Sequence, residues 1–158
     1  MNVIAGPEGL ASHIGQVLGT GDWLEVSQER IDRFAEATGD LQWLHVDPVR
    51  AASGPYGTTI AHGYLVLSLL PALTATAYSV DGATARINYG VDKVRFPSPL
   101  PAGSRVRVTS SLESVETVPA GVRAVVHNVV EMEGGAKPVC VADTVSLLIF
   151  PSPPEGEK

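Results

Sequence analysis

The spacing of hydrophobic positions changes along the chain, from helical in the first half to strand-like in the second. Residues 27–39 carry apolar or small side chains at helical intervals, so that one face is formed by Ile31, Phe34, Ala35 and Thr38. Ser27 can cap the start of this helix, and Gly39 supplies its C-terminal stop. Asp47 followed by Pro48 predicts the start of a second, short helix, because Asp accepts free N–H groups and Pro suits the first helical position.

A long apolar segment follows these two helices. No Asp, Glu, Lys or Arg occurs between Arg50 and Asp81, and the pattern predicts a helix that begins near His62 and is apolar on all sides. Its length approaches the roughly 20 residues of a membrane span, but its polar residues and the lack of basic flanks argue against insertion. We therefore expect a buried core helix, kinked or weakened at Pro71, and no membrane span.

The second half of the chain is rich in valine and partly alternating. Turn residues divide it into four predicted strands: 83–96, 104–117, 122–133 and 138–150. Residues 23–26 predict a further short strand. Helices followed by an antiparallel meander indicate an α+β fold, in which the sheet curls round the apolar helix and the strand at 23–26 completes its edge.

Length and charge narrow the function. The 158 residues fit one domain, at 1–150, followed by a proline-rich tail at 151–158 that we expect to be disordered. Eleven basic against seventeen acidic residues argue against nucleic-acid binding, which depends on Lys and Arg. Cys140 is the single cysteine and is expected to be a buried strand residue. The first residues lack the basic and apolar regions of a secretory signal, so we expect a cytoplasmic protein.

An acid and an imidazole lie in one short loop, and a histidine and a glycine precede the apolar helix. Hydration of an α,β-unsaturated thioester needs a base for water, a proton for the α-carbon and a donor to the thioester oxygen. Asp40 and His45 could share one water and serve the first two needs. The N–H of Gly63, at the helix start, could serve the third, and glycine would allow close approach of the substrate.

Each of these residues also has a structural interpretation. Asp40 could form a turn, His45 could be a packed core residue, and His62 could cap the helix or pack beneath it. A metal site formed by His45, Asp47 and His62 is a poor alternative, because Asp47 is better used as a helix cap. Neither a glycine-rich phosphate loop nor a nucleophile elbow is present in the sequence.

Residues 34–52 strongly resemble the hydratase signature of the MaoC-like family of (R)-specific enoyl-CoA hydratases. Residues 60–64 and 91–97 also match the family, and they resemble the branch that is related to nodulation protein N. The resemblance extends from about residue 15 to residue 149. It implies a hot-dog fold, in which an antiparallel sheet wraps a central helix, and a homodimer whose sheets join edge to edge. It also places the family's catalytic Asp, catalytic His and oxyanion glycine on Asp40, His45 and Gly63.

The chain departs from the family between Asp40 and His45. Many members have Asn-Pro there, whereas this chain has Gln42-Trp43, so we expect the bulkier Trp43 to reshape the loop or narrow the acyl tunnel. His62 and Tyr64, on either side of the oxyanion glycine, are expected to contact the substrate. Lys93 and Arg95, with the nearby Arg105 and Arg107, form an apparent basic cluster in an acidic chain. We expect some of them to meet the phosphates of CoA; the alternative is that they are solvated charges on strand faces.

The resemblance implies reversible hydration of trans-2-enoyl-CoA to (R)-3-hydroxyacyl-CoA, or the reverse dehydration of a CoA or acyl-carrier-protein thioester. Two alternatives remain: a thioesterase, because the same fold hosts thioester hydrolysis, and a non-catalytic acyl-binding module. The presence of both Asp40 and His45 argues against the binding module. This chemistry needs no metal, nicotinamide or flavin.

Overall fold

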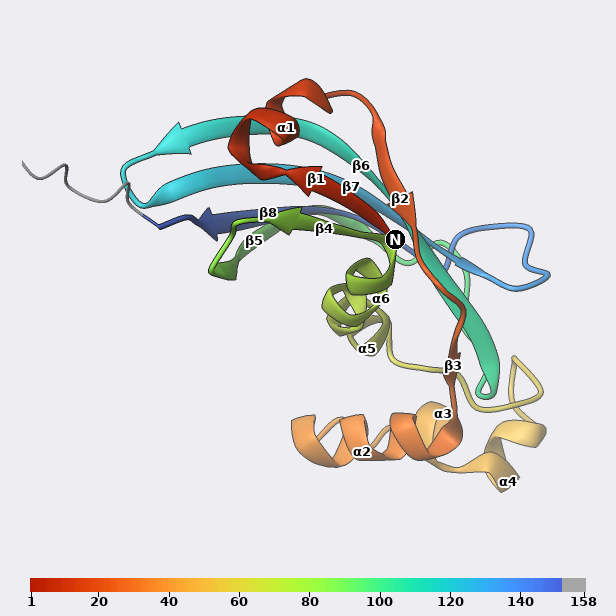
Figure 1. Ribbon diagram of the computed structural model, residues 1–158. Coiled ribbons are helices and arrows are strands. Elements are labelled where there is room, and N and C mark those ends of the chain that lie inside the picture. The colour runs from red at the N-terminus through yellow and green to blue at the C-terminus, as the bar shows by residue number, and fades with distance from the viewer. Residues whose placement is uncertain (152–158) are drawn as a thin grey trace, which may run out of the picture.

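The computed structural model describes residues 1–151, and its main feature is a curved sheet wrapped round two consecutive helices (Figure 1). All strand pairs in this sheet are antiparallel. From one edge to the other the strands are β2 (Val17–Thr20), β6 (Ser104–Val118), β7 (Gly121–Met132), β8 (Cys140–Ile149) and β5 (Ala85–Arg95), and β3 (Leu24–Val26) also pairs with β6. The predicted α+β class and hot-dog arrangement are confirmed. The predicted tail at 151–158 lies outside the described residues, apart from Pro151.

The central helix is divided into α5 (Gly63–Ser68) and α6 (Leu70–Ala77), which confirms the predicted weak point near Pro71. The break falls at Leu69, two residues before Pro71. Proline has no N–H and its ring clashes with the carbonyl four residues earlier, so the helical hydrogen-bond ladder is interrupted here. Both helices bury apolar side chains against the concave face of the sheet: Leu65, Val66, Leu70, Leu73 and Ala77.

In β6 and β7 the sheet faces its helices with alternate residues. In β6 the buried positions are Val106, Val108, Ser110 and Leu112, and in β7 every second residue from Val122 to Val130 is buried. Cys140, the first residue of β8, is buried in the same core, and burial raises the pKa of its thiol to about 11. The prediction that Cys140 is a buried strand residue is confirmed.

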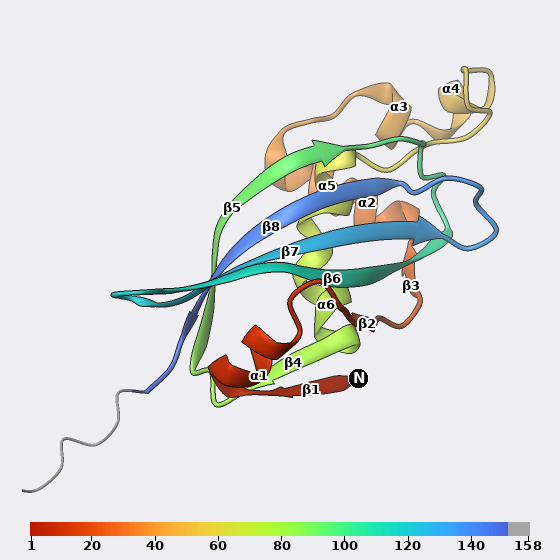
Figure 2. The same cartoon turned by 90° about the horizontal axis from the view of Figure 1, so that it is seen from above.

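The four long strands do not form a simple meander, contrary to the sequence-based expectation. β5 pairs with β8, and the connection at 96–103 carries the chain to the far side of β7, where β6 begins (Figure 2). This connection contains Pro97, Pro99 and Pro101. Prolines fix the backbone and remove donors, so a tight hairpin is disfavoured and a long crossing is formed instead. As a result, β5 and β6 are separated by two strands.

Several elements were not predicted, among them β2, α3 (Trp43–Val46) and a unit of three elements from the N-terminus and the centre of the chain. β1 (Asn2–Ala5) pairs in parallel with β4 (Tyr78–Asp81), and α1 (Gly6–Ser12) follows β1 directly. Ile4 and Leu10 from this unit are buried in the main core. The unit extends the core beyond the end of α6 (Figure 2).

A separate layer of short helices carries the acid and imidazole loop. It consists of α2 (Gln28–Thr38), α3 (Trp43–Val46) and α4 (Pro48–Ala52), which lie together below the sheet in Figure 1. The Ser27 side chain accepts from the N–H of Arg30, and Gly39 ends α2 in the left-handed conformation with φ 79°. Asp47 caps α4 by accepting from the N–H of Arg50 at 2.9 Å. These predicted caps are confirmed, and none of the helices within residues 1–151 is long and apolar enough to cross a membrane.

Candidate active site

Asp40, His45 and His62 meet where the loop after α2 passes the start of α5. A nitrogen or oxygen atom from each of the three side chains lies within 4.8 Å of the others. The sequence predicted the pairing of Asp40 with His45, which are five residues apart. His62 joins them only through the fold, because it is seventeen residues beyond His45 and belongs to another segment.

His45 is held in one orientation by its surroundings. Its side chain is buried, and Nδ1 lies 2.7 Å from the carbonyl oxygen of Ile60. A carbonyl can only accept, so Nδ1 must carry the proton, and in the neutral ring Nε2 is left as the acceptor. The main chain is also fixed, since Gln28 donates its side-chain amide to the His45 carbonyl at 2.7 Å. The structure therefore presents Nε2 of His45 as an available base.

Asp40 offers a carboxylate next to this base. It follows the left-handed Gly39, and its side chain is 51% exposed. Among the described residues its carboxylate forms no hydrogen bond to the main chain, so a turn-forming role is not observed. A half-exposed carboxylate beside a buried imidazole is an arrangement in which one water molecule could contact both groups.

His62 lies beneath both residues and is almost completely buried, with its side chain 2% exposed. Its Nε2–H donates to the main-chain carbonyl of Asp40 at 2.9 Å. Its ring stacks on the His45 ring with centroids 3.8 Å apart and planes 27° apart, and Phe34 packs against it from α2. The structure thus brings His62 into contact with the loop residues and encloses it, whereas the sequence suggested a contact with substrate.

Gly63 is the first residue of α5, where the helix itself provides no acceptor for the N–H group. The ring of Phe96 lies against it: a Cβ added at position 63 would be 2.8 Å from Cδ2 of Phe96. Tyr64 is 70% exposed and meets the edge of the same Phe96 ring, with centroids 6.2 Å apart. Phe96 was not singled out in the sequence, because its proximity to Gly63 depends on where β5 ends.

Trp43 packs on the side of the loop that faces α4. The guanidinium of Arg50 lies over its ring, 4.4 Å from the centroid. Gly54 approaches the same ring so closely that an added Cβ would lie 3.0 Å from Cζ3 of Trp43. The contacts of Trp43 thus explain how this bulky residue is accommodated in the loop.

The predicted basic cluster does not exist as one surface. Lys93 and Arg95 are on β5, whereas Arg105 and Arg107 are on β6, with β7 and β8 between them. Arg105 pairs with Glu133 at 3.2 Å, and Arg107 pairs with Glu131 at 2.5 Å. Both guanidinium groups also lie over the ring of Trp23. The sequence misled here because consecutive predicted strands were taken to be neighbours.

The two cations of β5 differ in their environment. Lys93 adopts a positive φ of 51° and reaches Asp143 of β8 at 3.4 Å. Arg95 donates to the carbonyl of its neighbour Val94 and is exposed. Of the four cations, Arg95 is the one for which the described residues supply no carboxylate partner.

A metal site was considered from the sequence with Asp47 as a ligand, and Asp47 instead caps α4. The remaining cluster of Asp40, His45 and His62 is organised by hydrogen bonds. Each histidine already uses one ring nitrogen on a main-chain carbonyl, and the stacked rings direct their in-plane lone pairs along nearly parallel planes. Metal sites need lone pairs that converge on one point. The geometry therefore fits acid–base chemistry better than metal ligation.

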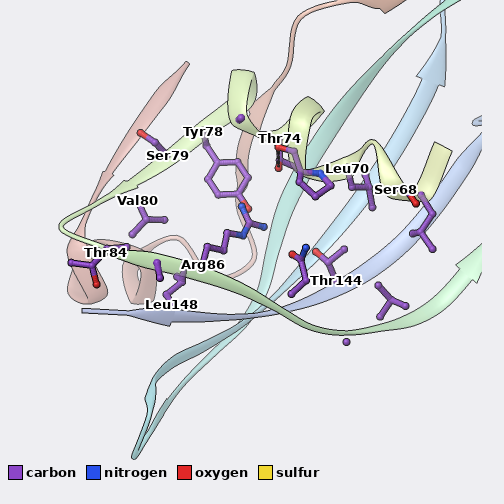
Figure 3. A pocket seen from close by; sticks show the side chains of 18 residues that line it. Ser68, Leu70, Thr74, Tyr78, Ser79, Val80, Thr84, Arg86, Thr144 and Leu148 are labelled. Carbon is purple, nitrogen blue, oxygen red and sulfur yellow. Dashed lines mark hydrogen bonds between the residues drawn. The ribbon is translucent and has the colours of Figure 1, made fainter. Parts of the chain in front are cut away.

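A large cavity lies further along the helices, apart from the Asp40 and His45 loop. Its volume is about 780 Å³, and it is open between α5–α6 on one side and β4–β5 on the other (Figure 3). Leu70 of α6, Leu148 of β8 and Arg86 of β5 line it, and Arg86 donates to Ser146 at 3.1 Å. None of Asp40, His45 and Gly63 lines it.

A curved sheet round a central helix, with an Asp–His loop placed over the start of that helix, defines the class of protein. The family model described as "MaoC like domain" matches residues 10–135, and the chain belongs to this family. The predicted hydro-lyase class is confirmed, because a similar protein is named as a 3-hydroxyacyl-thioester dehydratase.

The chain is 56% identical over 137 residues to 3-hydroxyacyl-thioester dehydratase Z of Mycobacterium tuberculosis, covering 86% of this chain and 91% of that one. It is 42% identical over 142 residues to nodulation protein N of Rhizobium leguminosarum bv. viciae, covering 88% of each. Among solved structures, the (R)-hydratase from A. caviae involved in PHA biosynthesis matches with a TM-score of 0.69 at 20% identity, covering 86% of this chain and 97% of that one. This structural likeness supports the fold, and the relatives support the predicted branch.

Proposed function

We propose that the protein interconverts a trans-2-enoyl-CoA thioester and the (R)-3-hydroxyacyl-CoA thioester by reversible addition of water. The observation that carries the proposal is the hydrogen bond from Nδ1 of His45 to the Ile60 carbonyl, which leaves Nε2 as a base beside the Asp40 carboxylate. The relative named 3-hydroxyacyl-thioester dehydratase Z supports the same reaction class.

In the hydration direction, one water molecule lies between Asp40 and Nε2 of His45. As its oxygen forms a bond to the β-carbon, the water proton passes to this pair, and the double-bond electrons move toward the thioester oxygen. The pair then returns one proton to the α-carbon, so that water is added overall. Dehydration is the same sequence in reverse.

The negative charge that develops on the thioester oxygen needs a donor. In this proposal the Gly63 N–H supplies it, since Gly63 is at the start of α5 and a helix leaves its first N–H groups free. Tyr64 and Phe96 lie beside it and form the nearest aromatic surface for the thioester. Arg95 is the best candidate for contact with the phosphates of CoA, because it has no carboxylate partner among the described residues. Lys93 could also contact them if its ion pair with Asp143 were broken.

The active form in this proposal is a homodimer. β5 is an edge strand of the described sheet, and it exposes three large apolar side chains: Ile87 at 48%, Tyr89 at 68% and Val91 at 48%. A long exposed apolar edge favours pairing with another strand. Residues of β5 also line the cavity in Figure 3, so a second copy paired at β5 would lie next to it.

The deciding experiment follows crotonyl-CoA by loss of the conjugated enoyl absorbance, with a thiol assay and chiral analysis of the product. Formation of (R)-3-hydroxybutyryl-CoA without thiol release supports the proposal. Thiol release without hydration would identify a thioesterase, and no turnover would favour an acyl-binding module. The same assay with a crotonyl acyl-carrier-protein thioester tests the choice of carrier: a much higher kcat/KM on that substrate would contradict the CoA assignment.

A further inference from the structure

His62 contains the one buried side-chain nitrogen or oxygen without a hydrogen-bond partner among the residues that the structure describes. The atom is Nδ1, and the ring is 2% exposed. Because Nε2 donates to the Asp40 carbonyl, the neutral ring has Nδ1 as an acceptor with no donor. A buried acceptor without a donor destabilises the fold, so its presence calls for an explanation other than stability.

The contacts of His62 supply that explanation. Its N–H holds the main chain of Asp40, and its ring supports the face of the His45 ring. One side chain therefore contacts both members of the proposed acid–base pair. The side chain itself is enclosed by these residues and by Phe34, so it cannot be the group that meets the substrate.

Resting on the proposed function, we infer that His62 is a positioning residue. Its Nε2–H···O=C hydrogen bond to Asp40 fixes the distance between the Asp40 carboxylate and Nε2 of His45, so that both contact one water. Asp40 lies in a loop, its side chain is 51% exposed, and its carboxylate accepts no main-chain hydrogen bond within the described region; Oδ2 lies 4.0 Å from Nε2 of His62. The hydrogen bond from His62 fixes the main chain of Asp40, and through it the region in which this carboxylate lies.

The inference requires two adjacent histidines in opposite tautomers. His45 carries its proton on Nδ1, toward Ile60, and His62 carries its proton on Nε2, toward Asp40. The chain has four histidines, so their imidazole nitrogen signals can be assigned by single substitutions. Nitrogen-15 NMR of the whole protein near neutral pH should show these two tautomers. Nδ1–H or a doubly protonated ring at His62 would overturn the inference.

Two variants separate the hydrogen bond from the ring. His62→Phe keeps an aromatic ring in the stack and removes both the donor and the unpartnered acceptor. We expect kcat to fall on the order of 100-fold, the cost of misplacing a reacting group by about 1 Å, while KM changes less than about threefold. The melting temperature should stay close to that of the wild type, because the loss of the donor to Asp40 is offset by removal of the buried acceptor that has no partner.

His62→Gln keeps an amide N–H in the position of Nε2 and removes the ring. It should recover about tenfold of the kcat lost in His62→Phe, because one hydrogen bond is restored. The matched control is His13→Phe, since His13 also hydrogen-bonds a main-chain carbonyl, that of Gly9, but in α1 at the other end of the molecule. This control should keep the wild-type kcat.

The outcomes are distinct. Wild-type kcat in His62→Phe, or a His62→Gln variant no more active than His62→Phe, would overturn the positioning role. If the wild-type protein hydrates no thioester, the proposed function fails, and the positioning role is then judged by NMR. In that case His62→Phe should increase the fast main-chain mobility at residues 40–42, and unchanged mobility would overturn it.

Discussion

The ring of Phe96 occupies the space in which a side chain at position 63 would begin, with Cδ2 of Phe96 only 2.8 Å from the place of a Cβ. Glycine at the start of α5 is thus required by a neighbour within the chain, as well as by any substrate that approaches the N–H group. This relationship changes what substitutions at position 63 can be expected to do.

Gly63→Ala keeps the N–H but forces the Phe96 ring to move, and we expect lower kcat/KM because the aromatic surface beside the thioester is displaced. Adding Phe96→Leu should restore part of the loss, since the smaller side chain leaves room for the new methyl group. Steady-state kinetics of the two single variants and the double variant measure this coupling. Equal losses in Gly63→Ala with and without Phe96→Leu would show that steric conflict is not the cause.

Asp40→Asn and His45→Gln should each lower kcat/KM by about 10²–10⁴, the usual contribution of a positioned acid or base. The double variant should be little worse than either single variant, because the two groups act on one water. Initial rates with crotonyl-CoA measure all three. Losses that multiply in the double variant would contradict the shared water, and a fully active Asp40→Asn would remove Asp40 from the mechanism.

Gln28→Leu should destabilise the fold by about 1–3 kcal/mol, because it leaves the hydroxyl of the buried Thr59 without its acceptor. It also removes the donor to the His45 carbonyl, so kcat should fall together with stability. Urea unfolding and kinetics at a temperature well below the transition measure the two effects. Gln16→Leu is the matched control, because Gln16 bonds an exposed carbonyl of Ser12 and should change neither. Unaltered stability in Gln28→Leu would mean that water replaces the lost partner.

Asp143 should make the stability of the protein depend on pH. Burial by itself raises the pKa of this carboxyl, but hydrogen bonds from His127 and Lys93, together with their charges, outweigh burial and lower the pKa below its ordinary value. A lowered folded-state pKa contributes stability above the unfolded-state pKa of about 3.9, and this contribution is lost as the pH falls through the folded-state pKa. Asp143→Asn should therefore be less stable than the wild type at pH 7, with a difference that shrinks below about pH 4.

Urea unfolding of this variant at several pH values measures the effect. Asp92→Asn is the control: Asp92 lies opposite Asp143 across the β5–β8 pair, where a second negative charge is unfavourable, so its neutralisation should not destabilise the protein. A difference between Asp143→Asn and the wild type that does not change with pH would show that the carboxylate charge contributes nothing.

Ile87→Lys combined with Tyr89→Lys should convert the proposed dimer to a monomer, because charged side chains on an edge strand oppose pairing with a second copy. Sedimentation velocity measures the mass, and circular dichroism should show an unchanged fold. Val17→Lys, at an exposed apolar position on the opposite edge of the sheet, should leave the dimer intact. A double variant that remains dimeric would place the interface elsewhere.

Local sequence determined the caps of α2 and α4 and the candidate loop. Ser27, Gly39 and Asp47 act on groups within a few residues of themselves, so their capping roles follow from neighbouring positions alone. The pairing of Asp40 with His45 is likewise confined to one loop. The valine-rich, partly alternating runs predicted the strands, and alternation continues in the burial of β6 and β7, because side chains of a strand point in turn to the two sides of a sheet.

Only the tertiary structure decided which distant segments meet. The crossing at 96–103 put β5 beside β8, which separated Lys93 from Arg107 and brought Phe96 onto Gly63. The same packing placed His62 under Asp40 and His45. Strand order depends on a connection that crosses the sheet, and contacts between segments depend on how helices pack on that sheet. Neither has a signal in the spacing of nearby residues, and so the residues that support the acid–base pair became visible only in the folded chain.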